Sequence, residues 1–87
     1  MLLLMERGKR RSVVHSPDYQ YLLKRLRQAR ASAGMTQVQV AQALGKPQSY
    51  VTKCELGERR IDPIDLQRFA NLYRKSFSYF LPPAARR

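Results

Sequence analysis

The strongest constraint on the fold is a break inside an otherwise helical stretch, at residues 45–47. Glycine readily takes the left-handed conformation that ends a helix, so Gly45 predicts a helix end just after Leu44. Pro47 biases the residue before it away from helical angles, which prevents the helix from continuing through the break. The sequence therefore predicts two short helices joined by a tight turn.

The outer ends of these two helices are also marked. Thr36 and Gln39 have the spacing of a capping box, in which the threonine side chain accepts from the backbone of the glutamine and the glutamine side chain bonds back. The first helix is therefore expected from residue 36 to about Leu44. Gly57 predicts the end of the second helix, which spans roughly Gln48–Leu56.

Further helices are expected on both sides. Ser16, Pro17 and Asp18 form a helix start, and the helix that follows ends at Gly34. Asp62 caps another helix, and the aromatic residues near position 80 predict a short fifth one, which Pro82 and Pro83 stop. No strand-like alternation is present. We expect an all-α domain, a compact bundle of about five helices over residues 16–82, with a basic arm (1–15) and a short basic tail (83–87).

The inward faces follow from the helical period of the apolar residues. The expected core positions are Tyr19, Leu22, Leu23, Leu26, Ala29, Ala33, Val40, Ala41, Leu44, Val51, Cys54, Leu66, Phe69, Ala70 and Tyr73.

The charge balance restricts the class of partner. The chain of 87 residues carries 17 Lys and Arg against 6 Asp and Glu, so its net charge is +11. Such a surface favours polyanions as partners, either nucleic acid or an acidic membrane, and charge alone does not choose between the two. The arm holds a basic cluster that either contacts DNA or serves as a solubilising tail, and both interpretations stay open. Its candidate DNA contacts are Arg7, Lys9, Arg10 and Arg11.

Several classes of function lack the residues they need. The single cysteine, Cys54, has no disulfide partner, and the lone His15 has no cluster of ligands around it, so we expect no metal and no cofactor. No nucleophile with a matched base is recognisable, which argues against an enzyme. The opening run of apolar residues is too short for an export signal or a membrane span, so a cytoplasmic location is expected; Met1 and Met5 both remain candidate start residues.

The second helix of the pair carries an unusual polar face. At about 100° per residue, Ser49, Thr52, Lys53 and Leu56 point away from its apolar edge, with Gln48 and Tyr50 on opposite flanks, and none of these side chains is acidic. Glutamine can pair with adenine, serine and threonine bond to several bases, and lysine reaches guanine or a phosphate. The face therefore predicts base reading by Gln48, Ser49, Thr52 and Lys53.

The stretch "MTQVQVAQALGKPQSYVTKCELGERR" resembles the phage-repressor and Cro-like (XRE-type) helix-turn-helix family. The likeness covers roughly residues 18–81, and its most telling pieces are Thr36-Gln37, Ala41, Leu44-Gly45, Gln48-Ser49, Val51, Glu55 and Gly57. It implies a lambda-repressor-like domain that binds double-stranded DNA as a homodimer on a two-fold-related site.

The resemblance also implies roles for particular residues. Gln48, Ser49, Thr52 and Lys53 would face bases. An ion pair between Arg30 and Glu55 would tie the first helix to the base-reading helix. Contacts to the phosphate backbone would come from Gln37, Lys46, Tyr50, Arg59 and Arg60.

The expected function is that of a sequence-specific transcriptional regulator, a repressor that occupies an operator. The alternative is an antitoxin or protein-interaction module that uses the same fold to hold a protein partner. RNA or nonspecific nucleoid binding is supported by charge alone, because a stacking platform for single strands is missing. The aromatic C-terminal segment serves either as core or as a dimer contact through Phe77, Tyr79, Phe80 and Leu81.

Overall fold

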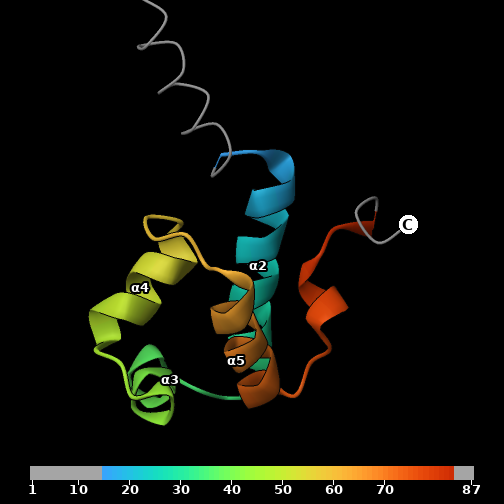
Figure 1. Cartoon of the computed structure of the whole chain (residues 1–87). Helices are drawn as coiled ribbons and strands as arrows, with labels where there is room; N and C mark the ends of the chain where they lie inside the picture. Colours follow the sequence, from blue (N-terminus) through green and yellow to red (C-terminus); the bar gives the residue numbers. More distant parts are fainter. Residues whose placement is uncertain (1–14, 84–87) are drawn as a thin grey trace, which may run out of the picture.

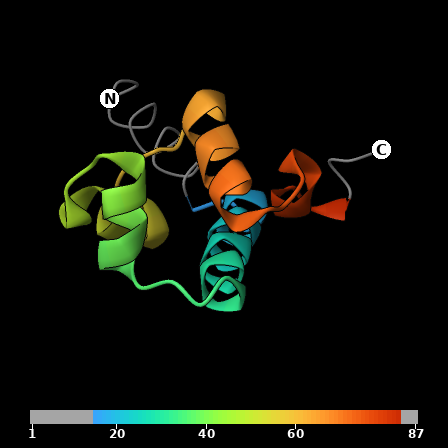
Figure 2. The same ribbon diagram turned by 90° about the horizontal axis from the view of Figure 1, so that it is seen from below.

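The computed structural model describes residues 15–83, and all of its regular elements are helical. In Figure 1, α2 runs through the middle of the domain, α3 and α4 lie on one side of it, and the C-terminal segment with η1 lies on the other; Figure 2 shows the same order from below. The all-α prediction is confirmed. The elements are α2 (Pro17–Ser32), α3 (Gln37–Leu44), α4 (Gln48–Leu56), α5 (Pro63–Tyr73) and the 3-10 turn η1 (Phe77–Phe80).

The helix starts are held by the side chains that the sequence marks. Ser16 Oγ accepts from the backbone N–H of Tyr19 at 3.2 Å. Thr36 and Gln39 form both bonds of the capping box, at 2.9 and 3.1 Å. The Asp62 carboxylate accepts from a first-turn backbone N–H at 2.8 Å. Each of these side chains satisfies a backbone donor that the helix itself leaves without a partner.

α2, α3 and α4 end near the glycines at which the sequence predicts their ends. Gly34, Gly45 and Gly57 all have positive φ, at 68°, 68° and 81°. The side chains of most other residues would clash with the backbone in this conformation, whereas glycine adopts it freely. The reversals after α2, α3 and α4 are thus encoded locally.

The core fills the space between α2, α5 and the α3–α4 pair. Val51 and Cys54 of α4 are fully buried and meet Val40 and Ala41 of α3. Because α4 buries this edge, its opposite edge is left in solvent. Most of the predicted core is confirmed. The exceptions are Ala33, which is exposed, and Tyr19, Leu22 and Leu44, which are only partly buried. The buried cluster consists of Leu26, Ala29, Val40, Ala41, Val51, Cys54, Leu66, Phe69, Ala70, Tyr73 and Phe80.

The expected number of helices is corrected: the described residues contain four α-helices, and the short fifth helix predicted near position 80 is a single 3-10 turn, η1, of four residues. Leu81, which follows η1, has an extended ψ of 141°, as expected for the residue before Pro82. The proline therefore leaves room for one tight turn only.

Of the two alternatives left open for the aromatic segment, Phe80 belongs to the core and not to a dimer contact. It is 0 % exposed, since η1 folds back on α2 and α5 and inserts this ring into the core. Phe77, Tyr79 and Leu81 are partly exposed. Arg25 of α2 secures the turn: its Nε donates to the Tyr79 carbonyl at 2.9 Å, and its guanidinium carbon lies 3.7 Å from the centre of the Tyr79 ring.

The candidate arm contacts Arg7, Lys9, Arg10 and Arg11 lie outside the described residues, as do positions 84–87 of the tail. Between residues 15 and 83, no helix combines the length and the apolar character needed to cross a membrane. The same range contains no cluster of three potential His, Cys, Asp or Glu metal ligands.

Candidate nucleic-acid interface

The turn between α3 and α4 sets the angle at which α4 is presented. Gly45 N–H bonds to the Gln42 carbonyl at 3.2 Å, and Lys46 N–H bonds to the Ala41 carbonyl at 2.9 Å. The side chain of Ala41, 4 % exposed, is small enough for the two helices to pack closely. Pro47 occupies the N-cap of α4, and no side chain caps the first turn of this helix.

Three of the four predicted base-reading side chains lie on the exposed face of α4. Gln48, Ser49 and Lys53 are all exposed. Ser49 and Lys53 point away from the buried edge formed by Val51 and Cys54, and Gln48 lies on a flank of that edge. A DNA groove placed against this face would meet hydrogen-bonding groups without a carboxylate among them.

Thr52 differs from the other three. It is partly buried, and its Oγ1 donates to Gln37 Oε1 at 2.7 Å. The predicted base reader on α4 is thus joined to the predicted phosphate ligand on α3. Sequence reasoning missed this bond, and no signal in the sequence distinguishes Thr52 from Ser49 or Lys53.

Gln37 continues into a buried ionic cluster. Its Nε2 donates to Glu55 Oε1 at 3.0 Å. Glu55 is 2 % exposed and also accepts from Arg30 through Nε at 2.7 Å and Nη2 at 3.1 Å. Such paired, charge-assisted bonds are short and directional. The structure therefore contains the ion pair that links α2 to α4, and its hydrogen bonds raise the pKa of Arg30 above the ordinary value.

Three of the five predicted backbone contacts, Lys46, Tyr50 and Arg59, lie together. Lys46 Nζ lies 5.2 Å and Arg59 Cζ 5.1 Å from the centre of the Tyr50 ring. The ring stacks parallel to Phe69 with 6.3 Å between centroids, and burial raises the pKa of the Tyr50 hydroxyl. Two cations are thus held on an aromatic platform beside α4. Arg60 is exposed in the loop after α4 but has no described contact with this cluster.

Among the described residues, α3, α4 and α5 each carry one large apolar side chain that is exposed. Leu56 closes α4 and is 62 % exposed, and Ile64, in the first turn of α5, is 65 % exposed. Val38 at the start of α3 is 46 % exposed. The helical period already places Leu56 on the outer side of α4, whereas sequence reasoning missed Ile64 and Val38.

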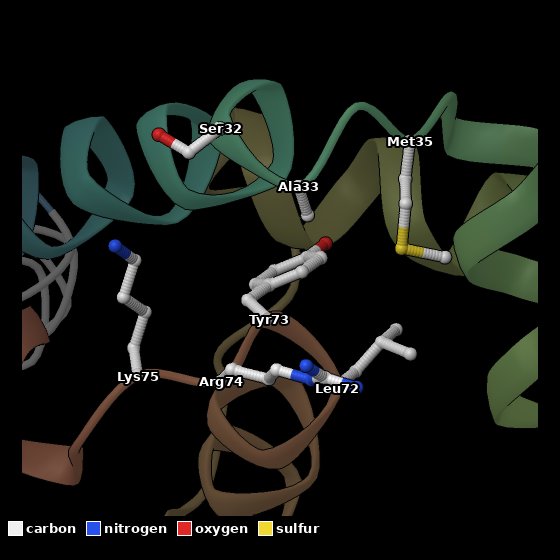
Figure 3. Close-up of a pocket in the computed structure, with 7 residues that line it drawn as sticks. All are labelled: Ser32, Ala33, Met35, Leu72, Tyr73, Arg74 and Lys75. Carbon is white, nitrogen blue, oxygen red and sulfur yellow. The ribbon is translucent and has the colours of Figure 1, made fainter.

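A shallow hollow lies between the ends of α2 and α5, shown in Figure 3. Its volume is about 440 Å³. The Tyr73 hydroxyl points toward Ala33, with Met35 to one side, and has no hydrogen-bond partner among the described residues. Burial raises the pKa of this hydroxyl. The sequence placed Tyr73 in the core but did not indicate a hollow beside it. The other residues that line the hollow are Ser32, Leu72, Arg74 and Lys75.

Comparison with protein families identifies the fold. A helix-turn-helix family model matches residues 26–80, more than half of the chain and inclusive of α3, the turn and α4. The chain belongs to this helix-turn-helix family, of the XRE or Cro/C1 type. The protein is accordingly a DNA-binding helix-turn-helix regulator, and the family is not normally enzymatic. The chain matches none of the curated proteins with which it was compared.

Proposed function

We propose that the protein is a sequence-specific regulator of transcription that represses by occupying an operator as a homodimer. The main support is the outer face of α4, where Gln48, Ser49 and Lys53 are exposed together beside a basic cluster. In a helix-turn-helix domain, the second helix of the motif enters the major groove.

Phosphate contacts bring the protein to DNA and set its register. Lys46 and Arg59 are held at the edge of α4 by the Tyr50 ring. Gln37 occupies the first position of α3, where the helix end carries a partial positive charge. These residues supply binding that does not depend on sequence, and Arg60 adds a further charge in the neighbouring loop.

Base contacts then select the operator. Gln48 pairs with adenine through two bonds, Lys53 reaches guanine, and Ser49 adds a bond of either sense. Each good bidentate pair discriminates against the wrong base by about 1–3 kcal/mol.

The dimer contact is supported by exposed apolar side chains. Leu56 and Ile64 flank the loop between α4 and α5, and burial of both against a second copy would hold two recognition helices at a defined spacing. Phe77, Tyr79 and Leu81 remain candidates for a separate dimer contact on the other side of α2, whereas Phe80 does not.

The test is selection from a randomised duplex library at two salt concentrations, followed by affinity measurements on the enriched sequence. We expect a two-fold-symmetric motif that survives the higher salt concentration. Loss of all affinity with salt and no enriched motif would contradict the proposal and favour a protein partner, to be sought by co-purification with the native chain.

Two variants separate the two kinds of contact. Lys46→Ala should weaken binding to all duplexes equally and lower the salt dependence, whereas Gln48→Ala should cost about 1–3 kcal/mol and relax the preference at one base pair. Lys24→Ala, which removes the same charge from an exposed position on α2, is the control for net charge. Equal losses on operator and random DNA for Gln48→Ala would refute base reading.

A further inference from the structure

The bond between Thr52 and Gln37 gives Thr52 a task other than base reading. Thr52 is partly buried, and its hydroxyl lies 2.7 Å from an oxygen of a side chain on another helix. The exposed neighbours Gln48, Ser49 and Lys53 lie on the solvent side of α4. Thr52 therefore stands between the reading face and the buried edge.

The direction of the hydrogen bonds follows from the chemistry of Glu55. An ionised carboxylate only accepts, so the Gln37 group that faces Glu55 must be the amide nitrogen. The amide oxygen consequently faces Thr52, and the hydroxyl of Thr52 must donate to it. Its only hydrogen is used within the protein.

The Gln37 amide is thereby oriented at both ends. Its oxygen accepts from Thr52, and one of its two amide hydrogens is donated to Glu55. The second amide hydrogen has no hydrogen-bond partner among the described residues. Glu55 is itself fixed by two bonds from Arg30, so the orientation is transmitted from α2 through α4 to the start of α3.

We propose that Thr52 is a positioning residue: it holds the Gln37 amide so that its second N–H is presented to a DNA phosphate. The inference rests on the phosphate contact of Gln37 in the proposed function. It changes the expected role of Thr52, which then contributes equally to binding of every sequence. The bond also links α4 to the start of α3, so the phosphate contact and the recognition helix keep one register.

The experiment compares Thr52→Val, Thr52→Ser, Gln37→Ala and the double variant Thr52→Val/Gln37→Ala. Their affinities are measured by fluorescence anisotropy on the selected operator and on its single-base variants. Loss of one neutral hydrogen bond predicts an affinity about three- to tenfold weaker for Thr52→Val, by the same factor on every duplex. Thr52→Ser keeps the hydroxyl and should restore most of the affinity.

The double variant supplies the decisive comparison. If Thr52 acts through Gln37, adding Thr52→Val to Gln37→Ala should cause no further loss. Thermal unfolding of each variant checks that the domain is folded at the assay temperature. Two results would overturn the inference and make Thr52 a base-reading residue. One is that Thr52→Val weakens affinity only through the preference at one base pair. The other is that its loss of affinity adds fully to the loss caused by Gln37→Ala.

Failure of the inference is separable from failure of the proposed function. If Gln37→Ala binds like the parent while Gln48→Ala still changes the preferred base, the Gln37 phosphate contact and the role of Thr52 both fail, and sequence-specific binding stands. If Gln48→Ala also leaves the base preference unchanged, base reading by α4 itself fails.

Discussion

The two sides of α4 use the same kinds of residue for different purposes. On the outer side, Gln48 and Ser49 are polar and exposed. On the inner side, toward α3, the partly buried Thr52 and the buried Glu55 are polar too, yet they are bonded to Gln37 of α3, and Glu55 is also bonded to Arg30 of α2. The comparison teaches that polarity in a recognition helix does not by itself mark a DNA contact, because burial decides which side chains are committed to the protein.

The largest effect is expected from the inner side. Glu55→Ala would remove the partner of Arg30 and of Gln37, and breaking a buried ion pair costs about 3–5 kcal/mol of unfolding free energy. The lower end is expected, since the Arg30 side chain is 23 % exposed and regains some water. Urea denaturation measures the loss. Gln48→Ala is the matched control on the outer side, and it should change the free energy of unfolding by no more than about 0.5 kcal/mol. A similar loss of stability for both variants would contradict the difference between the two sides.

A smaller effect, on binding alone, is expected from the outer side. Lys53→Met keeps a long side chain of similar helix propensity, so stability should change by less than about 0.5 kcal/mol. Affinity for the operator should fall by about 1–3 kcal/mol, with relaxed preference at one base pair. Anisotropy on single-base operator variants measures both. A uniform loss on all duplexes would instead make Lys53 a phosphate contact.

Raising the pH tests the ionisable side chains that packing shields from water. Burial raises the pKa of the Cys54 thiol from 9.0, and of the Tyr50 and Tyr73 hydroxyls from 10.0, in the folded protein. The unfolded chain therefore loses these protons first, and the stability they contribute is present below pH 9.0 and falls as pH rises through the raised values. Melting temperatures between pH 8 and 11 should decline. Tyr50→Phe should flatten the decline, whereas Gln48→Ala should leave its shape unchanged; a melting temperature constant to pH 11 would contradict the assignment.

The smallest effect is expected at Tyr73. Its hydroxyl is buried without a hydrogen-bond partner among the described residues, so Tyr73→Phe removes a desolvated polar group at no cost in packing. The free energy of unfolding should stay the same or rise by about 1 kcal/mol, with DNA affinity unchanged. Chemical denaturation checks the sign, and a clear loss of stability would show that the hydroxyl has a partner.

Much of the fold could be predicted because its signals are local. The capping box of Thr36 and Gln39 and the left-handed glycines at positions 45 and 57 act within a few residues. The same holds for the helical period that buries Val51 and Cys54. The segment near η1 was less predictable: Pro82 marks where it stops, but the direction of Phe80 comes from packing on α2 and α5.

The candidate site divides in the same way. The sequence alone determined where α3 and α4 begin and end and that Gln48, Ser49 and Lys53 share an outer face, because helical geometry and capping depend on neighbours in the chain. Only the tertiary structure decided that Thr52 bonds to Gln37, 15 residues away, and that Lys46 and Arg59 meet at one ring. Such contacts depend on the angle between two packed helices, which is set by the whole core rather than by any short stretch of residues.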